Sequence, residues 1–309
     1  MTEIVKLNAK DKRILFELSK DARVSMSKIG RNIGLSKEVV RYRVERLINS
    51  GVIKRIVPII NNFALNIEIF RLLINLHNLK EGSRKEIVDE LNKEPSISVR
   101  ILIESRYDLD ILMYVSTPGE FYDFYEKLLK KYGSLILNKD LSIISRQWYL
   151  HHKYLIDENT PITIGEKKIV NISKNSHKIL NILRRDARTP VLDIANELNV
   201  SSSSVIYSIK QMKRLNIIAG YKLTLDLGLL GYNKCKVGIS LSDLAHKEDI
   251  IHYLTKQKSV CKITEFIGDM DFDFELVFKT ISELDTFVQD LRSSHPQIRD
   301  YEVTNVLEI

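Results

Sequence analysis

The chain has 309 residues, of which 44% are hydrophobic and 28% charged, which is the composition of a globular protein long enough for two or more domains. No apolar run approaches the roughly 20 residues that a bilayer span needs, and the start of the chain lacks the apolar core of a signal peptide. We therefore expect a cytoplasmic protein without a membrane segment. Cys235 and Cys261 are too few and too far apart for a zinc knuckle or a disulfide framework, so we expect no metal and no cofactor.

Positive charge is concentrated in two segments. Residues 1–60 contain fourteen Lys and Arg against six Asp and Glu, and residues 171–230 contain nine against four. The two segments therefore hold +8 and +5, and the rest of the chain sums to 7 − 13 = −6. A basic segment that occurs twice favours a polyanionic partner, although a solvated charged surface is the alternative for either one alone.

Three short helices are predicted at the start of the chain. Asn8, Ser25 and Ser36 are their N-caps, and apolar residues recur at helical spacing after each. Gly51 ends the third helix, and the β-rich stretch 52–60 follows. Two short helices joined by a tight turn, with a strand after the second, are typical of a winged helix-turn-helix. A small helical domain that binds nothing is the alternative.

The third of these helices has a basic face that suits DNA. Because Val40, Val44 and Leu47 face inward, the polar side chains around them point outward, where Arg and Lys contact phosphates and read guanine. Two acids on this side, Glu38 and Glu45, indicate either cytosine reading or an ion pair within the helix. The predicted DNA contacts are Ser36, Lys37, Arg41, Tyr42, Arg43 and Arg46, together with Lys54 and Arg55 on the strand.

The tripeptide Asp-Ala-Arg occurs at 21–23 and again at 186–188. At this offset, 186 − 21 = 165, the apolar positions of the two segments align without a gap. An offset of this length indicates a duplicated domain or domain pair. The second copy has Ser208 in place of Arg43 and Asn216 in place of Gly51, which leaves its base reading an open question. Its predicted DNA contacts are Ser201, Ser202, Ser203, Ser204, Lys210 and Lys213.

A second type of domain follows each helical segment. Residues 68–150 and 233–309 both have the pattern βαββαβ, that of a ferredoxin-like domain. In 270–278 apolar residues alternate with Asp271, Asp273 and Glu275, which predicts a sheet with one buried face. The fold class is α+β, with two tandem units of winged helix-turn-helix plus ferredoxin-like domain. The expected bounds are 1–62 and 63–155 for copy one, 156–172 for a linker, and 173–230 and 231–309 for copy two.

The segment "DKRILFELSKDARVSMSKIGRNIGLSKEVVRYRVERLINSGVIKR" resembles the DNA-binding half of the Lrp/AsnC transcription regulators. The likeness rests on the Ile-Leu pair, the Asp-Ala-Arg turn, the Leu-Ser before the third helix, Arg43-Val44 and the Gly-Val-Ile that leads into the strand. The likeness occurs in both copies of the repeat, and the two copies together cover nearly the whole chain. In this respect the chain is similar to the fused double-unit members of the family found among archaea. The resemblance implies that the ferredoxin-like domains pair, either within one chain as a pseudo-dimer or between chains as a homodimer.

The resemblance also implies an effector site. In the family, small effectors, commonly amino acids, bind near a Gly-containing turn between the second and third strands of the companion domain. Copy two has "GDMD" there, so Gly268, Asp269 and Asp271 are the candidate effector residues. The alternative is a glycine that the turn needs only for a positive φ. Copy one has "SRYD" at 105–108, without the glycine and with two bulky side chains that crowd the turn.

The predicted function is a sequence-specific DNA-binding transcriptional regulator, not an enzyme, with double-stranded DNA as partner and no membrane partner. If two heads face one side of B-DNA, their half-sites lie about 34–36 Å apart or a multiple of that. Unequal heads favour an asymmetric operator. The first alternative is a sirohaem decarboxylase, because those enzymes have a similar layout. Their histidine-rich turn corresponds in this chain to "RILIESRYDLD" and "KITEFIGDMDFD", and neither segment contains histidine. The second is a sequence-blind chromatin-architectural protein.

Overall fold

A computed structural model describes residues 4–103, 105–156, 161–165 and 168–307. The chain forms two compact units, and each takes one part from either copy of the repeat. Residues 1–65 and 149–233 make the head unit, and residues 66–148 and 234–309 make the sheet unit. The domain bounds expected from the sequence remain a prediction. Two stretches of the predicted linker, 157–160 and 166–167, lie outside the described residues, as do the last two residues of the predicted final strand.

Head 1, the helical part of copy one, has the three predicted helices. They are α1 (Ala9–Lys20), α2 (Met26–Ile33) and α3 (Lys37–Asn49), followed by strand β1 (Ile53–Ile60) and the short 3-10 turn η1 (Asn62–Leu65). Asn8, Ser25 and Ser36 accept hydrogen bonds from the backbone of their helices, which confirms the three predicted N-caps. After α3, Gly51 has a φ of 75°, the left-handed conformation that ends a helix.

Head 2, the helical part of copy two, repeats this order. It comprises α6 (Lys174–Arg185), α7 (Val191–Leu198), α8 (Ser202–Arg214), strand β7 (Ile218–Leu225) and η3 (Gly228–Leu230), with the short strand β6 (Ile162–Ile164) ahead of it. Asn199 takes a left-handed φ of 52° where copy one uses Gly34 with a φ of 68°. Asparagine tolerates this conformation better than most residues. The tight turn before the third helix therefore survives the loss of its glycine.

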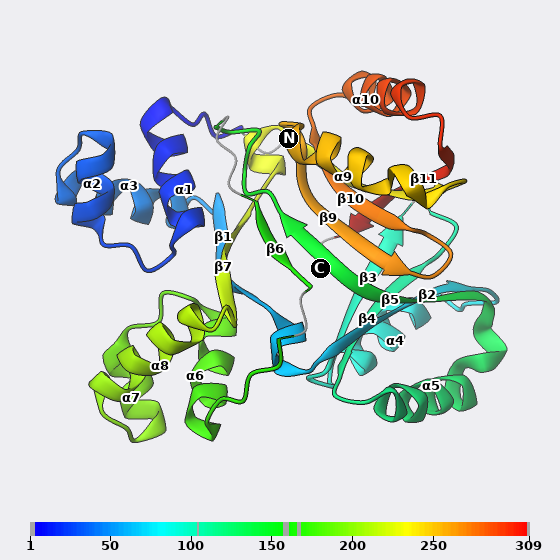
Figure 1. Cartoon of the computed structure of the whole chain (residues 1–309), viewed down its shortest axis with the longest axis horizontal. Coiled ribbons are helices and arrows are strands. Elements are labelled where there is room, and N and C mark those ends of the chain that lie inside the picture. Colours follow the sequence, from blue (N-terminus) through cyan, green and yellow to red (C-terminus); the bar gives the residue numbers. More distant parts are fainter. Residues whose placement is uncertain (1–3, 104, 157–160, 166–167, 308–309) are drawn as a thin grey trace. The chain divides into compact units, whose positions relative to one another are not determined.

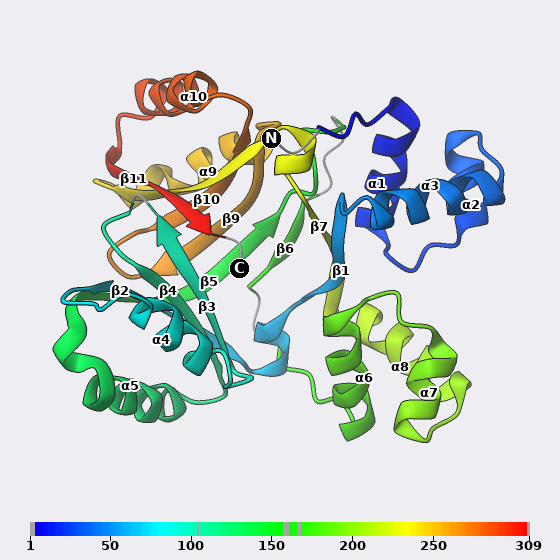
Figure 2. The same cartoon turned by 180° about the vertical axis from the view of Figure 1, so that it is seen from behind.

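The two heads share one strand pair and one hydrophobic core. Strands β1 and β7 pair antiparallel, with Ile56 opposite Leu223 and Pro58 opposite Tyr221 (Figures 1 and 2). Among the described residues each of these two strands pairs with the other alone, so each has a free edge. Pro58 lacks an N–H donor, and an edge strand is where a proline is tolerated. Helix α1 packs on β7 and helix α6 on β1, so each head is completed by the strand of the other. A single buried cluster runs through both heads.

The sheet unit contains two βαββαβ domains, as predicted. Copy one contributes β2 (Glu68–Leu76), α4 (Ser83–Leu91), β3 (Ile97–Ile103), β4 (Leu109–Val115), α5 (Pro118–Tyr132), η2 (Gly133–Leu135) and β5 (Ile136–Tyr149). Copy two contributes β8 (Asn233–Leu241), η4 (Leu244–His246), α9 (Lys247–Lys256), β9 (Val260–Ile267), β10 (Phe272–Phe278), α10 (Ile281–Ser294) and β11 (Ile298–Leu307).

The strands of the sheet unit close on themselves. Their order is β2-β4-β3-β11-β8-β10-β9-β5, and β2 also pairs with β5. Copy one joins copy two where β11 pairs with β3, with Val306 opposite Leu102, and again where β5 lies next to β9. Helices α4 and α5 flank this ring on one side and α9 and α10 on the other (Figures 1 and 2). A closed ring leaves no unpaired strand edge among these eight strands.

This closure corrects one prediction. The alternating pattern of 270–278 was expected to give one buried and one solvated face, but every residue of β10 is buried. Asp273 of this strand meets Arg71 and Lys236 from other strands of the ring, whereas the ring of Phe274 packs against Phe287 of α10. Alternation therefore marks two different buried environments in this strand rather than a boundary with water.

Four charged residues meet inside the ring and form what we call the charge quartet. Arg71 of β2 and Asp110 of β4 come from copy one, and Lys236 of β8 and Asp273 of β10 from copy two. Arg71 donates to Asp110 at 3.0 Å and to Asp273 at 3.3 Å, and Lys236 Nζ lies 3.0 Å from Asp273 and 3.5 Å from Asp110. Burial alone lowers the pKa of Arg71, but the charges of Asp110 and Asp273 outweigh it and raise that pKa above its usual value.

Two further observations bear on the sequence predictions. Cys235 is buried in β8, and burial raises the pKa of its thiol to about 12, so it is a protonated core residue at neutral pH. Across the described part of the chain, no helix combines the length and the apolar character needed to cross a membrane.

Candidate nucleic-acid interface

Helix α3 exposes the face that the sequence predicts. Val40, Val44 and Leu47 are buried, while Lys37, Arg41, Tyr42, Arg46 and Asn49 are exposed and Arg43 is half-buried. Ser36 is exposed as well, but its hydroxyl already accepts a hydrogen bond from the Val39 amide at 3.2 Å as the N-cap. The helix therefore offers a row of basic and aromatic side chains to a partner, with the inward orientation fixed by its apolar stripe.

A buried acid, Asp11, forms ion pairs with two of these arginines. Arg43 donates to Oδ1 of Asp11 at 2.8 Å and Arg46 to Oδ2 at 2.7 Å, and the Asp11 side chain is 1% exposed. Asp11 also accepts from the Asn8 amide at 3.3 Å in the capping box of α1. The carboxylate thus ties α3 to the start of α1 and sets the direction of both guanidinium groups. Sequence reasoning missed Asp11, because a single acid in a first helical turn reads as a simple dipole partner.

The acids of α3 remain on the exposed face. A backbone hydrogen bond is the largest cause that lowers the pKa of Glu38, with smaller contributions from Ser36, Lys37 and Arg41. Glu38 therefore stays ionised at neutral pH at the start of the helix, where a negative charge is favourable. This position at the helix start is a structural reason for an acid in a basic surface. Glu45 is also exposed on this helix.

The strand residues of the predicted contact set differ in their surroundings. Lys54 Nζ lies 3.1 Å from Asp226, which belongs to copy two. Arg55 is exposed on β1. Because β1 pairs with β7, this strand does not project as a separate wing, and its basic residues lie beside the other head. Whether either residue contacts DNA stays a prediction.

Helix α8 of head 2 has fewer charges. Ser201 is its N-cap and accepts from the Ser204 amide at 3.2 Å, while Ser203 and Ser204 are exposed and Ser202 is half-buried. Lys210 is exposed, but Lys213 Nζ lies 3.1 Å from Asp21 of head 1 and packs over the Tyr221 ring. At the positions of Lys37, Arg41, Arg43 and Arg46, head 2 has Ser202, Ile206, Ser208 and Gln211.

The repeated Asp-Ala-Arg turns hold the two heads together, an arrangement we call the DAR clasp. Arg23 donates to the carbonyl oxygens of Ala187 at 2.8 Å and Thr189 at 3.0 Å, and Arg188 donates to that of Ala22 at 2.6 Å. Burial, followed by the charge of Arg23, lowers the pKa of Arg188. Each arginine thus satisfies backbone carbonyls of the opposite copy. The tripeptide recurs where the two copies meet.

The candidate effector residues of the sheet unit already have partners. Asp271 Oδ2 accepts from the Leu241 amide at 2.7 Å, and Asp269 lies 3.7 Å from Arg106 of copy one with both side chains exposed. Gly268 does not have a positive φ. Instead, a Cβ there would lie 2.5 Å from the Cβ of Ser142 on β5. The glycine is explained by close approach of this strand, and an effector role for the three residues remains a prediction.

We expect Gly268→Ala to lower the free energy of unfolding by about 1–3 kcal/mol, because its methyl group overpacks the contact with β5. The Cβ would also lie 3.3 Å from the Leu141 carbonyl oxygen, so the neighbour that must move includes backbone. Urea denaturation measures the change. The control is Gly119→Ala, where the nearest atom is 3.8 Å from the new Cβ. Equal stability of both variants would contradict the close approach.

Comparison with known proteins places these heads in a family. A family model for winged helix-turn-helix DNA-binding domains matches residues 7–54 and 172–219, once in each copy. An uncharacterized HTH-type transcriptional regulator of Pyrococcus horikoshii is 31% identical over 147 residues, which is 47% of this chain and 90% of that protein. The regulatory protein AsnC of Haemophilus influenzae is 31% identical over 37% of this chain and 77% of its own length. The chain belongs to the Lrp/AsnC family of transcriptional regulators.

Membership in the Lrp/AsnC family confirms the resemblance and the DNA-binding function drawn from the sequence. Each of these two relatives matches less than half of this chain but most of its own length, as expected if one copy of the repeat corresponds to one whole relative. A solved structure of the siroheme decarboxylase NirDL aligns over 97% of this chain and 91% of its own, with a TM-score of 0.65 and 13% identity. At that identity the likeness concerns the fold only.

Proposed function

We propose that this Lrp/AsnC regulator acts as a two-headed protein, in which both heads of one chain contact a single duplex at an asymmetric operator. The observation that supports this best is the head unit itself, where β1 pairs with β7 and the DAR clasp joins the copies. In this proposal the sheet unit is an intra-chain pseudo-dimer, supported by its closed strand ring. The half-sites are then about one helical turn apart or a multiple of it. The protein works where its DNA is, in the cytoplasm.

Head 1 is the stronger reader in this proposal. Four positions of the third helix are basic in head 1 and uncharged in head 2, which removes four candidate phosphate or guanine contacts. Lys213, one of the remaining lysines of α8, has Asp21 as a partner within the head unit. Head 2 therefore contributes fewer charge contacts and positions the chain rather than reading most of the bases.

We expect the double variant Arg41→Ala, Arg46→Ala to bind DNA more weakly and with a shallower salt dependence. Each phosphate that the variant no longer neutralises reduces the slope of log affinity against log salt by about 0.9. Weaker binding to both specific and random duplexes indicates phosphate contacts, and selectively weaker binding to the specific duplex indicates base reading. Fluorescence anisotropy at several salt concentrations measures both. Ile206→Ala, at the position of Arg41 in head 2, is the control, and unchanged affinity of the double variant would remove α3 as the recognition helix.

We infer that the chain is not an enzyme. Neither of the two turns that correspond to the histidine-rich segment of sirohaem decarboxylases contains histidine. Adding sirohaem to the purified protein tests this: a visible spectrum of bound haem would support the decarboxylase alternative. Selecting bound fragments of the genome separates a regulator from a sequence-blind architectural protein, which recovers all sequences equally.

An amino-acid effector remains part of the proposal. Asp269 is exposed at the turn of copy two, and its carboxylate suits an ammonium group once it leaves Arg106. The surface ion pair between these residues is weak, because both side chains are largely solvated. Asp271, held by a backbone amide, orients the turn rather than the ligand.

A further inference from the structure

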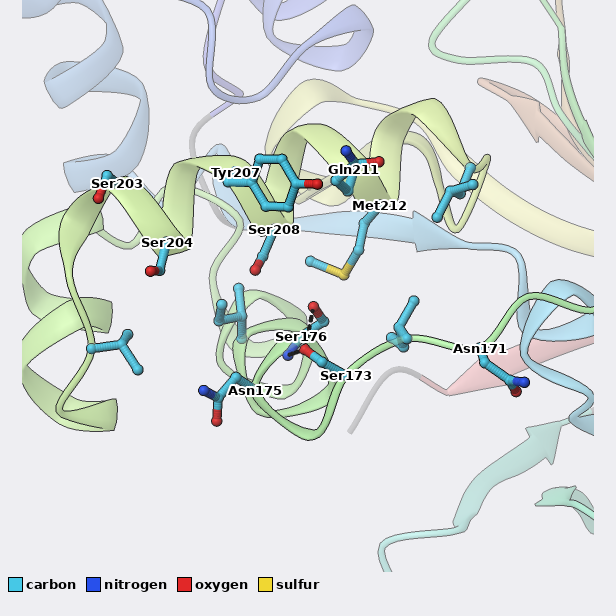
Figure 3. Close-up of a pocket in the computed structure, with 14 residues that line it drawn as sticks. Asn171, Ser173, Asn175, Ser176, Ser203, Ser204, Tyr207, Ser208, Gln211 and Met212 are labelled. Carbon is cyan, nitrogen blue, oxygen red and sulfur yellow. Dashed lines mark hydrogen bonds between the residues drawn. The ribbon is translucent and has the colours of Figure 1, made fainter.

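Head 2 contains a groove between the start of α6 and helix α8 that we call the α6–α8 groove. Its volume is about 610 Å³, within the range of small-molecule sites. Figure 3 shows Ser208 and Met212 pointing from α8 toward Ser173 and Ser176 of the α6 start. Tyr207, 65% exposed, lies at its rim.

Head 1 has a charged cluster at the equivalent positions. With the offset of 165, the residues Asp11, Arg43 and Arg46 correspond to Ser176, Ser208 and Gln211. In head 1 the two guanidinium groups of α3 reach across to the carboxylate of Asp11 in α1. In head 2 two hydroxyl groups and one amide replace them, and the groove stands open. The two heads thus have the same helices but different side chains at these three equivalent positions.

The walls of the groove define the chemistry of an occupant. No charged side chain is among the described residues that line it. Hydroxyl and amide groups come from both helices, while Ile179, Val200 and Met212 supply an apolar floor. A charged ligand would lose its hydration without a counter-charge, whereas a neutral ligand with several hydroxyl groups exchanges water for these partners. The exposed ring of Tyr207 offers a surface on which a flat or apolar ligand face can stack.

We propose that the α6–α8 groove binds a small, uncharged, polyhydroxylated molecule, with the chemistry of a nucleoside or a neutral saccharide. The ligand contacts α6 and the third helix of head 2 at the same time. Its binding therefore restrains the helix that faces DNA in the proposed function, and the affinity of head 2 for DNA depends on the ligand. Head 1, where the charged Asp11 ion pairs take the place of these hydroxyl and amide groups, does not bind it.

The test observes the groove without DNA, so its outcome is independent of the proposed operator binding. The intact chain is labelled with ¹³C-methyl methionine, and the Met212 methyl, which is buried at the groove floor, reports on occupancy. Adenosine and uridine form one arm, and sucrose and trehalose the other, each titrated to millimolar concentration. We expect a saturable shift of the Met212 signal in one arm, with the other methionine signals unchanged.

Two variants locate the site. Tyr207→Ala, at an exposed position that leaves the fold intact, should weaken binding about tenfold by removing the stacking surface. Tyr42→Ala, the equivalent change in head 1 at a residue 66% exposed, should leave it unchanged. The triple variant Ser176→Asp, Ser208→Arg, Gln211→Arg, which transplants the head 1 cluster, should abolish the shift. No Met212 shift with any probe, or equal weakening in the two tyrosine variants, overturns the proposal.

Discussion

Asp110→Asn is expected to lower the free energy of unfolding by about 3–5 kcal/mol, the typical effect of removing one partner from a buried ion pair. The substitution keeps the shape of the side chain but leaves Arg71 and Lys236 with Asp273 as the one remaining carboxylate of the quartet. Asp110 is 0% exposed and Arg71 5% exposed, so water does not compensate the excess positive charge. The quartet joins both copies, and we expect the whole sheet unit to be affected.

Urea and thermal denaturation of the full chain measure this effect. The matched control is Glu248→Gln, which removes one of the two carboxylate partners of Arg146, from an ion pair in which both side chains are well exposed. Its expected effect is within about 1 kcal/mol. If Asp110→Asn were as stable as this control, the charges of the quartet would be solvated like those of a surface ion pair. The burial of these side chains inside the ring would then be wrong.

Asp11→Ala is expected to be the second most damaging change, with a loss of about 2–3 kcal/mol of stability and weaker DNA binding by head 1. The variant removes the acceptor of Arg43 and Arg46 and half of the capping box of α1. The partial exposure of both arginines limits the stability cost, since water reaches them after the change. Their freed side chains lose the fixed direction from which they meet DNA.

Ser176→Ala is the matched control, because Ser176 occupies the equivalent position of head 2 and forms its hydrogen bonds with Ser173 at the start of α6. We expect it to cost less than about 1 kcal/mol and to leave the DNA affinity unchanged. The comparison uses chemical denaturation for stability and anisotropy for binding. A variant Asp11→Ala that keeps full stability and affinity would show that the arginines do not depend on this acid.

Local features of the fold could be predicted from the sequence because their causes are local. The N-caps Asn8, Ser25 and Ser36 and the inward stripe Val40, Val44 and Leu47 were each identified correctly, since capping and helical periodicity depend on a few neighbouring residues. The order βαββαβ followed in both copies for the same reason. The aligned apolar positions of the repeat gave two independent examples of each element, so a prediction in one copy could be checked against the other.

Long-range pairings could not be predicted in the same way. The antiparallel contact of β1 with β7 and the closure of the ring depend on which edges of the two copies meet, and no short pattern encodes that choice. For Asp271, Asp273 and Glu275 the alternation with apolar residues was recognised, but its polar side was assigned to solvent. In a closed ring that side faces a second buried environment, where Asp273 meets Arg71 and Lys236.

The candidate site shows the same division. The exposed face of α3 was predicted, whereas the role of Asp11 was not, because it depends on two arginines 32 and 35 residues later in the sequence. The α6–α8 groove arises from Ser176, Ser208 and Gln211, residues that read as ordinary polar positions until they are compared with their charged equivalents. A signal for both was present in the repeat, at the positions where charge in one copy is absent from the other.

The stoichiometry and footprint of the purified chain on a duplex selected from its own genome test most directly whether the two heads of one chain share one operator. At low ionic strength we expect one chain per duplex and two protected segments of unequal sequence, with centres about 34–36 Å apart or a multiple of that. Two chains per duplex with one protected segment each, or a complete lack of binding, would contradict the account.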